Sequence, residues 1–462
     1  MKTQRVTKNY LRSVLVTLTM ASALQSCNPS SSSSGSSNSN SANSCQARTM
    51  SSATASDKDS MQNNNDLFQD VNNVSVRSNN NQDQDDAQTR FVKIDVGQLK
   101  QRLLNRRSNN FHLPLLNNKS VNVVLQSVKK YSANNIVATG KTDNDELSNV
   151  TIVINDDVIT ANVGETLSQE SYEIRFAGNG VHTVKAITAK DDDCLTVEGE
   201  NAHNLVQPLA TESAKDVTAM AAVPTIDVLV AYTPAALNNV GGLSAMKALI
   251  QMGVADSNKA YQSSGVNLAL RLVGIMALSQ SESSFTSDLS SLKGTSDGKW
   301  DGVHAERKRL GADLVSVVAY YPSTSTAGIG FVGSSYSSGF SITKTTAFKQ
   351  FSFTHELGHN IGLNHSDGYE NASGRFRTIM AYGTYTRIPR FSNPAIDYNS
   401  YATGTSSNNS ASILNARGAG VAAFSASVTQ SDLPENSDPI TDPGLPGEPC
   451  TDSEAPPASA SE

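Results

Sequence analysis

Cysteine, tryptophan and excess positive charge are all scarce in this chain of 462 residues. It has four cysteines and one tryptophan, and 43 Asp and Glu against 36 Lys and Arg give a formal net charge of −7. No basic run marks a nucleic-acid surface, so we expect no nucleic-acid partner. Residues 225–427 contain no cysteine, so packing or a metal, and not disulfides, must hold that segment together.

Long hydrophobic runs are also absent, and the one short run lies at the N-terminus. Residues 13–24 are mostly apolar but too few to span a bilayer, and four basic residues precede them: Lys2, Arg5, Lys8 and Arg12. This pattern predicts a signal peptide over residues 1–26. Leu24-Gln25-Ser26-Cys27 is similar to a bacterial lipobox, which implies that Cys27 carries a lipid anchor to the membrane. The alternative is a plain secretory signal. The protein is then exported from a bacterial cell, as an outer-membrane or cell-surface lipoprotein or as a secreted protein.

Composition divides the rest of the chain. Residues 27–89 are rich in Ser, Asn and Gln, which predicts a disordered tether. Residues 90–200 contain β-branched segments, such as 121–125, 150–154 and 172–176, separated by turn signals, which predicts a small β-rich pro- or accessory domain. We expect a linker over residues 201–224, a second domain over residues 225–427, and an acidic disordered tail over residues 428–462, which contain no Lys or Arg.

Strand and helix patterns alternate within residues 225–427. Strands are expected at 226–232, 268–275 and 314–320, and a helix capped by Ser244 is expected between the first two. This alternation indicates a mostly parallel sheet covered by helices. The glycine-punctuated segment 327–333 is expected to be an edge strand, and a further helix is expected over residues 347–361.

The histidines of residues 355–365 have the spacing of a zinc site. The segment reads His-Glu-Leu-Gly-His-Asn-Ile-Gly-Leu-Asn-His. His355 and His359 lie four residues apart, so a helix presents both imidazoles on one face. Gly362 can take the positive φ of a sharp turn, and His365 then returns as a third ligand. Three neutral imidazoles leave one coordination position open, as in catalytic zinc sites.

With Met380 downstream, this segment resembles the motif of the metzincin metallopeptidases, His-Glu-x-x-His-x-x-Gly-x-x-His followed by a Met-turn. Residues 226–234, 311–315, 376–382 and 390–394 resemble the bacterial reprolysin-like group, which includes peptidyl-Asp metalloendopeptidases. Ser366 separates His365 from Asp367, whereas many reprolysins have Asp directly after the third histidine.

The resemblance implies an α+β fold: a metzincin-like catalytic domain with a twisted, mostly parallel sheet, an antiparallel edge strand, an active-site helix and a Met-turn, preceded by the small β-rich domain. It also implies one catalytic Zn²⁺ as cofactor. A Ca²⁺ site stays an open alternative that no motif supports.

The same resemblance assigns roles to single residues. Glu356 is the general base, and Met380 forms an apolar floor beneath the metal. Tyr382 either stabilises the oxyanion or ligates zinc, or is a tyrosine bonded elsewhere. Arginines that flank the Met-turn either recognise an acidic P1′ side chain or form ordinary ion pairs; they are Arg375, Arg377, Arg387 and Arg390.

Cys194 stands just upstream of the second domain, after Asp191-Asp192-Asp193. Its thiol could block the open zinc position of a latent enzyme. The surrounding residues do not match the phrases known for that role, and the competing interpretations are a disulfide partner or a solvated acidic turn. The pairing of Cys45, Cys194 and Cys450 stays undetermined.

The function predicted from these features is an exported zinc-dependent endopeptidase acting on protein or peptide substrates, with a preference for Asp or Glu at P1′. One alternative is a non-enzymatic surface lipoprotein that binds a partner through its β domain or sheet edge. Another is a zinc hydrolase that acts on a different amide.

Overall fold

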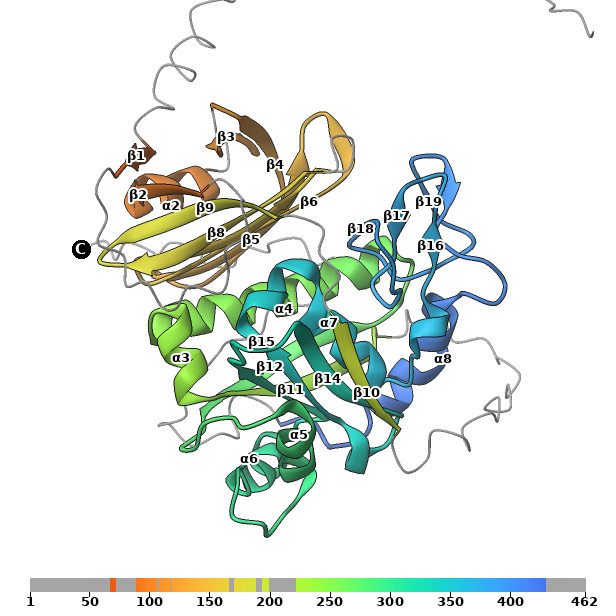
Figure 1. Ribbon diagram of the computed structural model, residues 1–462. Helices are drawn as coiled ribbons and strands as arrows, with labels where there is room; N and C mark the ends of the chain where they lie inside the picture. The colour runs from red at the N-terminus through yellow and green to blue at the C-terminus, as the bar shows by residue number, and fades with distance from the viewer. Residues whose placement is uncertain are drawn as a thin grey trace, which may run out of the picture. The chain divides into compact units, whose positions relative to one another are not determined.

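The computed structural model describes residues 67–71, 89–105, 108–116, 118–165, 170–187, 193–198 and 222–428. The predicted signal peptide, Cys27, most of the tether and linker, and the acidic tail beyond Val428 lie outside these ranges, as do Cys45 and Cys450. The described residues combine helices and sheets in an α+β architecture (Figure 1). Across those ranges, no helix has both the length and the apolarity needed to cross a membrane.

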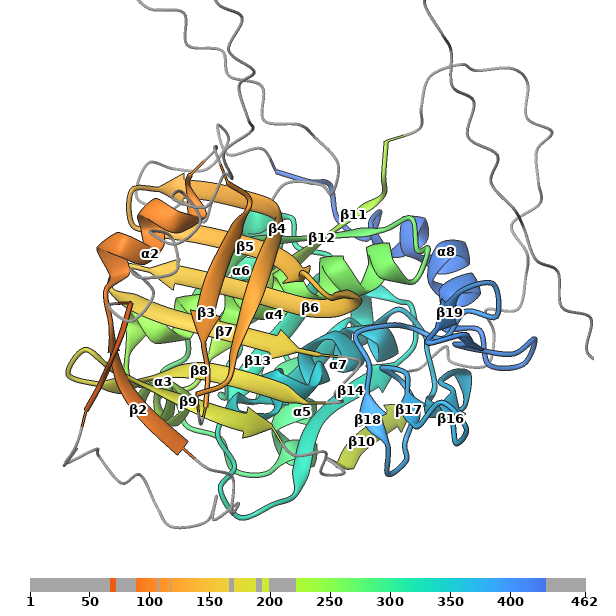
Figure 2. The same ribbon diagram turned by 90° about the horizontal axis from the view of Figure 1, so that it is seen from above.

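The N-terminal sheet has nine strands, and every neighbouring pair is antiparallel (Figure 2). Its order is β1-β2-β9-β8-β7-β6-β5-β4-β3. The three segments predicted to be strands fall within β4, β6 and β8. The strand bounds are Phe68–Asp70 (β1), Thr89–Ile94 (β2), Asn110–Pro114 (β3), Ser120–Ser132 (β4), Asn135–Thr142 (β5), Asp145–Asn155 (β6), Val158–Gly164 (β7), Ser171–Gly178 (β8) and Val181–Ile187 (β9).

Helices pack on both faces of this sheet, and the two-residue period of its strands explains how. In β6, Ile152 and Ile154 enter an apolar core shared with helix α2 (Val96–Leu103). Val153 points to the opposite face and joins the core that contains helix α4 (Leu243–Ser263). The sheet therefore packs on α4, which belongs to the second, C-terminal part of the chain.

The C-terminal part is built on a six-stranded sheet with the order β10-β14-β15-β13-β11-β12. All neighbours are parallel except β14 and β15, which are antiparallel. The strands expected at 226–232, 268–275 and 314–320 correspond to β11, β12 and β13. The bounds are Asp193–Glu198 (β10), Thr225–Tyr232 (β11), Ala269–Ala277 (β12), Leu314–Ala319 (β13), Thr326–Val332 (β14) and Phe340–Lys344 (β15).

Strand β11 is buried on both faces, as its continuous apolar sequence predicts. Val228 and Val230 pack into the core that contains α4 and helix α7 (Ser352–Asn360). Leu229 and Ala231 pack into a second core with helices α5 (Phe285–Lys293) and α6 (Gly302–Leu310). The sheet is thus a layer between two sets of helices, and α7 lies on the α4 face (Figure 1).

Three local predictions were wrong. Ser244 does not cap α4, whose N-cap is Gly242; its hydroxyl instead donates to Asp156, in the turn between β6 and β7, at 2.6 Å. The single helix expected over residues 347–361 is broken at Phe351, whose φ of 61° separates the 3₁₀ helix η3 (Thr345–Gln350) from α7. Segment 327–333 forms β14 but not the sheet edge, because β10 pairs along its outer side.

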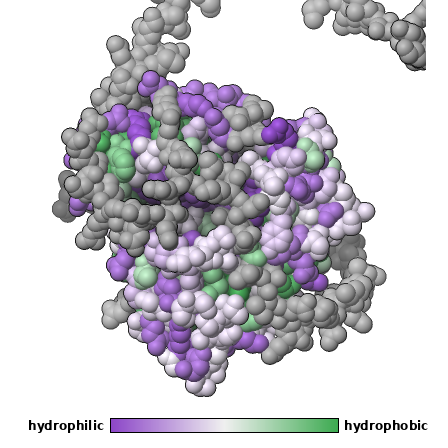
Figure 3. Space-filling model, in the orientation of Figure 1, coloured by the Kyte–Doolittle hydropathy of each residue, from purple (hydrophilic) through white to green (hydrophobic). Residues whose placement is uncertain are grey.

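The remaining elements surround these two sheets. On the face shown in Figure 3, hydrophilic side chains cover most of the described surface and the apolar patches are small and separate. The remaining bounds are Pro234–Val240 (α3), Tyr336–Ser338 (η2), His365–Asp367 (η4), Glu370–Asn371 (β16), Phe376–Arg377 (β17), Thr386–Arg387 (β18), Asp397–Tyr398 (β19), Tyr401–Ala402 (β20) and Ser410–Val421 (α8).

Candidate metal centre

Helix α7 carries the first two histidines of the motif. His355 and His359 lie one turn apart on its buried face, with at most 1 % of either residue exposed. Their Nε2 atoms are 3.0 Å apart. The helix therefore places two imidazole nitrogens at the separation that a shared metal ion requires.

A sharp turn after α7 returns the third histidine to the first two. Gly362 has a φ of 99°, and its carbonyl accepts a hydrogen bond from Arg417 Nη1 at 2.7 Å. A Cβ at this position would lie 3.1 Å from Arg417 Cζ and closer still to Nη1, so both the φ and the contact require glycine. His365 then follows in η4, and its Nε2 lies 3.2 Å from the Nε2 atoms of His355 and His359.

Hydrogen bonds of the Nδ1 atoms fix the tautomers of His355 and His359. His355 Nδ1 lies 2.7 Å from the Ile379 carbonyl, and His359 Nδ1 lies 2.7 Å from the Leu363 carbonyl. Since a carbonyl only accepts, both Nδ1 atoms carry the proton and donate it. The Nε2 atoms of His355 and His359 are therefore unprotonated, and each presents its lone pair toward His365 Nε2.

The three imidazoles are held neutral. Burial lowers the pKa of His359 to about 3 and that of His365 to about 4, and it lowers the pKa of His355 well below its ordinary value. The lone pairs of neutral imidazole nitrogens that lie 3.0 to 3.2 Å apart repel one another unless a cation lies between them. Tetrahedral zinc with Zn–N bonds of about 2.1 Å would separate its ligands by about 3.4 Å. The donor set and its spacing thus fit zinc.

Glu356 presents its carboxylate beside this cluster. The residue is fully buried on α7, and burial raises the pKa of its carboxyl to about 8, although the Cys194 thiol and the Arg387 guanidinium oppose that shift. Strand β14 crosses directly over it at Gly328, where a Cβ would lie 2.7 Å from Glu356 Cδ and closer to Oε1. The missing side chain at Gly328 therefore leaves the space that the carboxylate occupies.

Cys194 of strand β10 joins this cluster. Strand β10 places its thiol 3.1 and 3.4 Å from the two carboxylate oxygens of Glu356 and 3.6 Å from His359 Nε2. The thiol and the three histidine nitrogens lie within 4.8 Å of one another. Burial raises the pKa of Cys194 well above its ordinary value, and the Glu356 carboxylate adds to the shift. The cluster therefore combines three histidines with a thiol from a segment more than 150 residues earlier in the chain.

Met380 and Tyr382 lie in the loop between β17 and β18. Met380 is fully buried, and a Cβ at Gly358 of α7 would lie 2.8 Å from its sulfur, so it packs against the helix that carries two histidines. The Tyr382 ring lies 4.0 Å from the His365 ring, centre to centre. Its hydroxyl donates to the Cys194 carbonyl oxygen at 2.6 Å, although 46 % of the residue is exposed.

The four candidate arginines occupy different environments. Arg377 and Arg390 are buried and donate to backbone carbonyls: Arg377 to Tyr385 and Ala381, and Arg390 to Ser263. Both therefore have structural contacts that hold loops in place.

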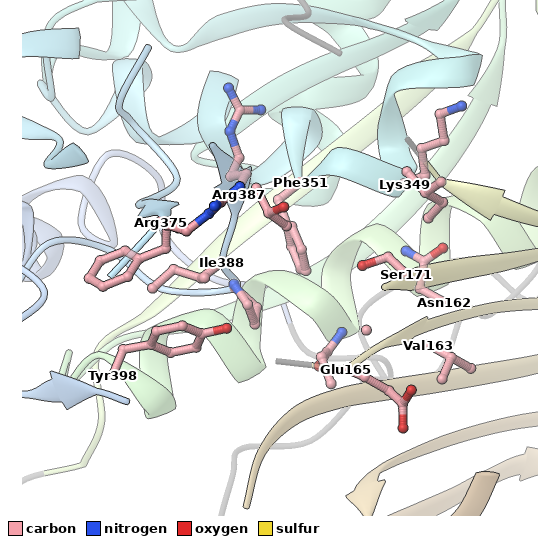
Figure 4. A pocket seen from close by; sticks show the side chains of 16 residues that line it. Asn162, Val163, Glu165, Ser171, Lys349, Phe351, Arg375, Arg387, Ile388 and Tyr398 are labelled. Atoms are coloured by element: carbon pink, nitrogen blue, oxygen red, sulfur yellow. The ribbon is translucent and has the colours of Figure 1, made fainter. Parts of the chain in front are cut away.

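Arg375 and Arg387 instead line a cavity of about 40 Å³ between the N-terminal sheet and the loops after α7. Figure 4 shows them on the side opposite Glu165, Asn162 and Ser171 of the N-terminal sheet. Arg387 Nη1 donates to the Gln350 carbonyl at 2.9 Å, and its charge acts on Glu356 and His365. Arg387 is thus the guanidinium of the four that is placed near the metal ligands.

Comparison with known proteins agrees with this geometry. Residues 222–411 match the family model of the M12B reprolysin-like metallopeptidases. A peptidyl-Asp metalloendopeptidase of Stenotrophomonas maltophilia (strain K279a) is 38 % identical over 204 residues, which cover 40 % of this chain and 48 % of that protein. A peptidyl-Asp metalloendopeptidase of Xanthomonas campestris pv. campestris is 29 % identical over 303 residues, covering 61 % of this chain and 70 % of that protein. The chain spans about half the length of the two Stenotrophomonas relatives that it matches.

A solved structure shows only a distant likeness. The crystal structure of metalloproteinase-II from Bacteroides fragilis is 12 % identical, with a TM-score of 0.37, covering 61 % of this chain and 86 % of that one. The matches to the family model and to the curated relatives are more specific than this structural likeness. Residues 222–411 are thus similar to the M12B reprolysin-like metallopeptidases, and the matching relatives are named peptidyl-Asp metalloendopeptidases.

Proposed function

We propose that this chain is an exported zinc-dependent endopeptidase of the metzincin type, acting on protein or peptide substrates. The observation that carries the proposal is the convergence of three histidine Nε2 atoms, 3.0 to 3.2 Å apart, beside the Glu356 carboxylate. Zinc held by His355, His359 and His365 would supply Lewis acidity for attack on a peptide carbonyl.

The chain's own groups handle the proton and the developing charge. Glu356 accepts a proton from the attacking water and passes it to the leaving amine nitrogen. Tyr382 donates a hydrogen bond to the scissile carbonyl oxygen as that oxygen gains negative charge. The hydroxyl already donates to a backbone carbonyl, that of Cys194, on a strand that pairs with β14 beside the metal ligands. That contact supports the role, because a substrate carbonyl bound along β14 would lie within reach of the same hydroxyl. Met380 packs beneath α7 and keeps the two helical histidines in place.

Hydrolysis of a peptide library, read by mass spectrometry, tests this function. We expect cleavage that a chelator abolishes and added zinc restores. The Cys194→Ala variant is assayed beside the natural chain, so that a blocked site is not mistaken for an inactive one. Absence of cleavage from both proteins, each carrying one zinc per chain, would reject the endopeptidase.

The N-terminal part of the chain supports a further proposal, that the full chain is a latent zymogen. Strand β10 pairs with β14 in parallel, whereas a substrate is expected to pair with the same strand in the antiparallel direction. Its Cys194 contributes a thiol contact to Glu356 and a carbonyl contact to Tyr382. A substrate would therefore have to displace β10 before it could reach the two groups proposed to act on it.

Activity of a cysteine variant tests this latency. Cys194→Ala removes the thiol contact, so we expect its activity to exceed that of the natural chain by about tenfold or more. The matched control is Cys45→Ala, which should not change activity. Equal activity of all three proteins would contradict a blocking role for Cys194.

A preference for Asp or Glu at P1′ is the finer part of the proposed function, and we assign it to Arg387. Two observations support the assignment: the curated relatives are named peptidyl-Asp metalloendopeptidases, and Arg387 lies near the metal ligands and also lines a cavity. Its guanidinium can bind a carboxylate by two parallel hydrogen bonds.

Matched peptides with Asp, Asn or Leu at P1′ test this assignment. Arg387→Met should lower kcat/KM for the Asp peptide by about thirtyfold or more, as expected when roughly 2 kcal/mol of charge pairing is lost. Arg309→Met, which removes an arginine on α6 that pairs with Glu306, is the control and should leave the preference unchanged. Equal cleavage of the Asp and Leu peptides by the natural protein would refute the preference.

Export and lipid anchoring rest on the sequence of residues 1–27 alone. We propose that Cys27 is lipidated and that the domain stands off the membrane on the following tether. Metabolic labelling with a radioactive fatty acid should mark the natural chain and not Cys27→Ser. Equal labelling of both, or of neither, would contradict the anchor.

A further inference from the structure

A cavity of about 250 Å³ lies between the N-terminal sheet and the C-terminal part of the chain, and none of the candidate metal ligands lines it. Strands β8 and β9 form one wall, and α3, α4 and η3 form the other. Four charged side chains line it: Glu173, Arg175, Lys185 and Lys349.

Strand periodicity explains why three of these charges share one wall. In β8, Tyr172 and Ile174 enter the apolar core with α2, so Glu173 and Arg175 must face the other way. Lys185 of β9 stands directly across from Glu173 in the ladder and therefore shares its face. The fourth charge, Lys349, comes from η3 on the opposite wall.

The cavity carries an excess of positive charge. Arg175 Nε donates to Glu173 Oε2 at 3.2 Å, and the side chains of these two residues are only 20 % and 12 % exposed. Burial alone would raise the pKa of Glu173, but Arg175, Lys349 and Lys185 together lower it, so this carboxylate is ionised. Three cations then face a single carboxylate, which leaves two positive charges uncompensated by the cavity lining.

Among the three cations, the positive charges of the two lysines are the least neutralised by neighbouring groups. Within the described residues, neither the Lys185 nor the Lys349 ammonium group has a hydrogen-bond partner. Each depends on the carboxylate of Glu173, to which Arg175 is already bonded. Like charges in a partly buried space repel each other strongly, because the surrounding dielectric is low. A bound anion would remove that repulsion and supply acceptors for both ammonium groups.

We propose that this cavity binds a small polyvalent oxyanion of the phosphate or phosphomonoester class. Arginine and lysine donors converging from two walls match the chemistry that binds phosphate oxygens. Threonine hydroxyls at Thr160 and Thr346 also line the cavity and can donate to the same oxygens. The volume accommodates one such anion together with a few water molecules.

Binding at this place would join two parts of the chain. Arg175 and Lys185 belong to the N-terminal sheet, and Lys349 belongs to the C-terminal part. The anion would therefore favour the arrangement in which the sheet packs on α3, α4 and η3. This consequence for latency rests on the proposed function, whereas the binding itself does not.

Calorimetric titration of the full chain with inorganic phosphate tests the site, with sodium chloride of equal ionic strength as the salt control. We expect saturable binding and a rise in the unfolding temperature that chloride does not reproduce. Lys349→Gln should weaken phosphate binding by about tenfold or more. In the absence of phosphate it should be at least as stable as the natural protein, because the repulsion is reduced. A lysine with a merely structural role would not give that second result.

The control is Lys308→Gln, which removes an exposed lysine on α6 and should leave phosphate binding unchanged. A parallel titration with phosphoserine separates a phosphomonoester from the free ion as the preferred ligand. A response to phosphate that chloride reproduces, or equal binding by the natural protein and Lys349→Gln, would overturn the proposal. Since no peptide is hydrolysed in these titrations, a failure of the proposed protease activity would not change their result.

Discussion

Replacement of Gly328 by alanine should disable Glu356 without changing the metal ligands. Gly328 lies in β14 where that strand crosses helix α7, and its φ is not in the left-handed region, so alanine is allowed by the backbone. A Cβ there would lie 2.7 Å from both Cδ and Cγ of Glu356. Non-bonded carbon atoms prefer separations of about 3.5 to 4.0 Å.

The carboxylate must therefore move by about 1 Å, which is far enough to misplace the proposed general base. A displacement of about 1 Å can cost on the order of a hundredfold in rate, equivalent to about 2.7 kcal/mol of transition-state stabilisation. We expect kcat/KM to fall by roughly that factor. Zinc content should stay at one per chain, because the new methyl group contacts Glu356 and not the histidine nitrogens.

The assay is peptide hydrolysis together with metal analysis, after the N-terminal segment has been removed by proteolysis within the predicted linker. Gly420→Ala on α8 is the matched control, since a Cβ there meets no atom within 4 Å. The control should keep full activity. If Gly328→Ala retained activity within about threefold while binding zinc, the position assigned to Glu356 would be wrong.

Three further predictions concern the framework of the site and the N-terminal sheet. Gly362→Ala should weaken zinc binding by about ten- to a hundredfold in chelator competition, because the turn that returns His365 is strained and Arg417 is displaced; unchanged affinity would refute this. His182 is buried, its Nε2 accepts the Ile159 N–H, and burial lowers its pKa from 6.5 to about 4. Stability should therefore be present above pH 6.5 and fall by about 3 kcal/mol as the pH drops to about 4, since the unfolded chain binds the proton first. Urea unfolding of His182→Gln should lack that part of the pH dependence, and an unchanged pH profile would contradict it. Asp256→Ala should cost about 3 kcal/mol of unfolding free energy, because three buried side chains of the N-terminal sheet donate to this carboxylate at about 1 kcal/mol each; a loss below about 1 kcal/mol would contradict it.

Features determined by local sequence were the ones that could be predicted. Strands β11 and β13 are apolar runs buried on both faces, so their positions follow from hydrophobicity alone. The spacing of His355, His359 and His365 likewise predicts their convergence, because a helical turn and one glycine-dependent reversal are local geometry.

Features determined by distant contacts could not be predicted. Cys194 meets Glu356 because β10 pairs with β14, and no local pattern encodes a pairing across more than a hundred residues. The same pairing changes β14 from an edge strand to an internal one. Arg387 and Arg377 are both close to the Met-turn in the sequence, so the sequence does not distinguish them. Their tertiary contacts do: Arg387 lies near the metal ligands, whereas Arg377 holds a loop. The break at Phe351 was missed because nothing in its sequence neighbourhood requires a positive φ.

The most direct test of the central claim compares the natural protein with Glu356→Ala for zinc content and peptide hydrolysis in the same preparation. The account predicts one zinc per chain in both proteins, with hydrolysis lost in the variant, because the histidines hold the metal and Glu356 moves the proton. Undiminished hydrolysis by Glu356→Ala, or a natural protein that hydrolyses peptides without zinc, would contradict it.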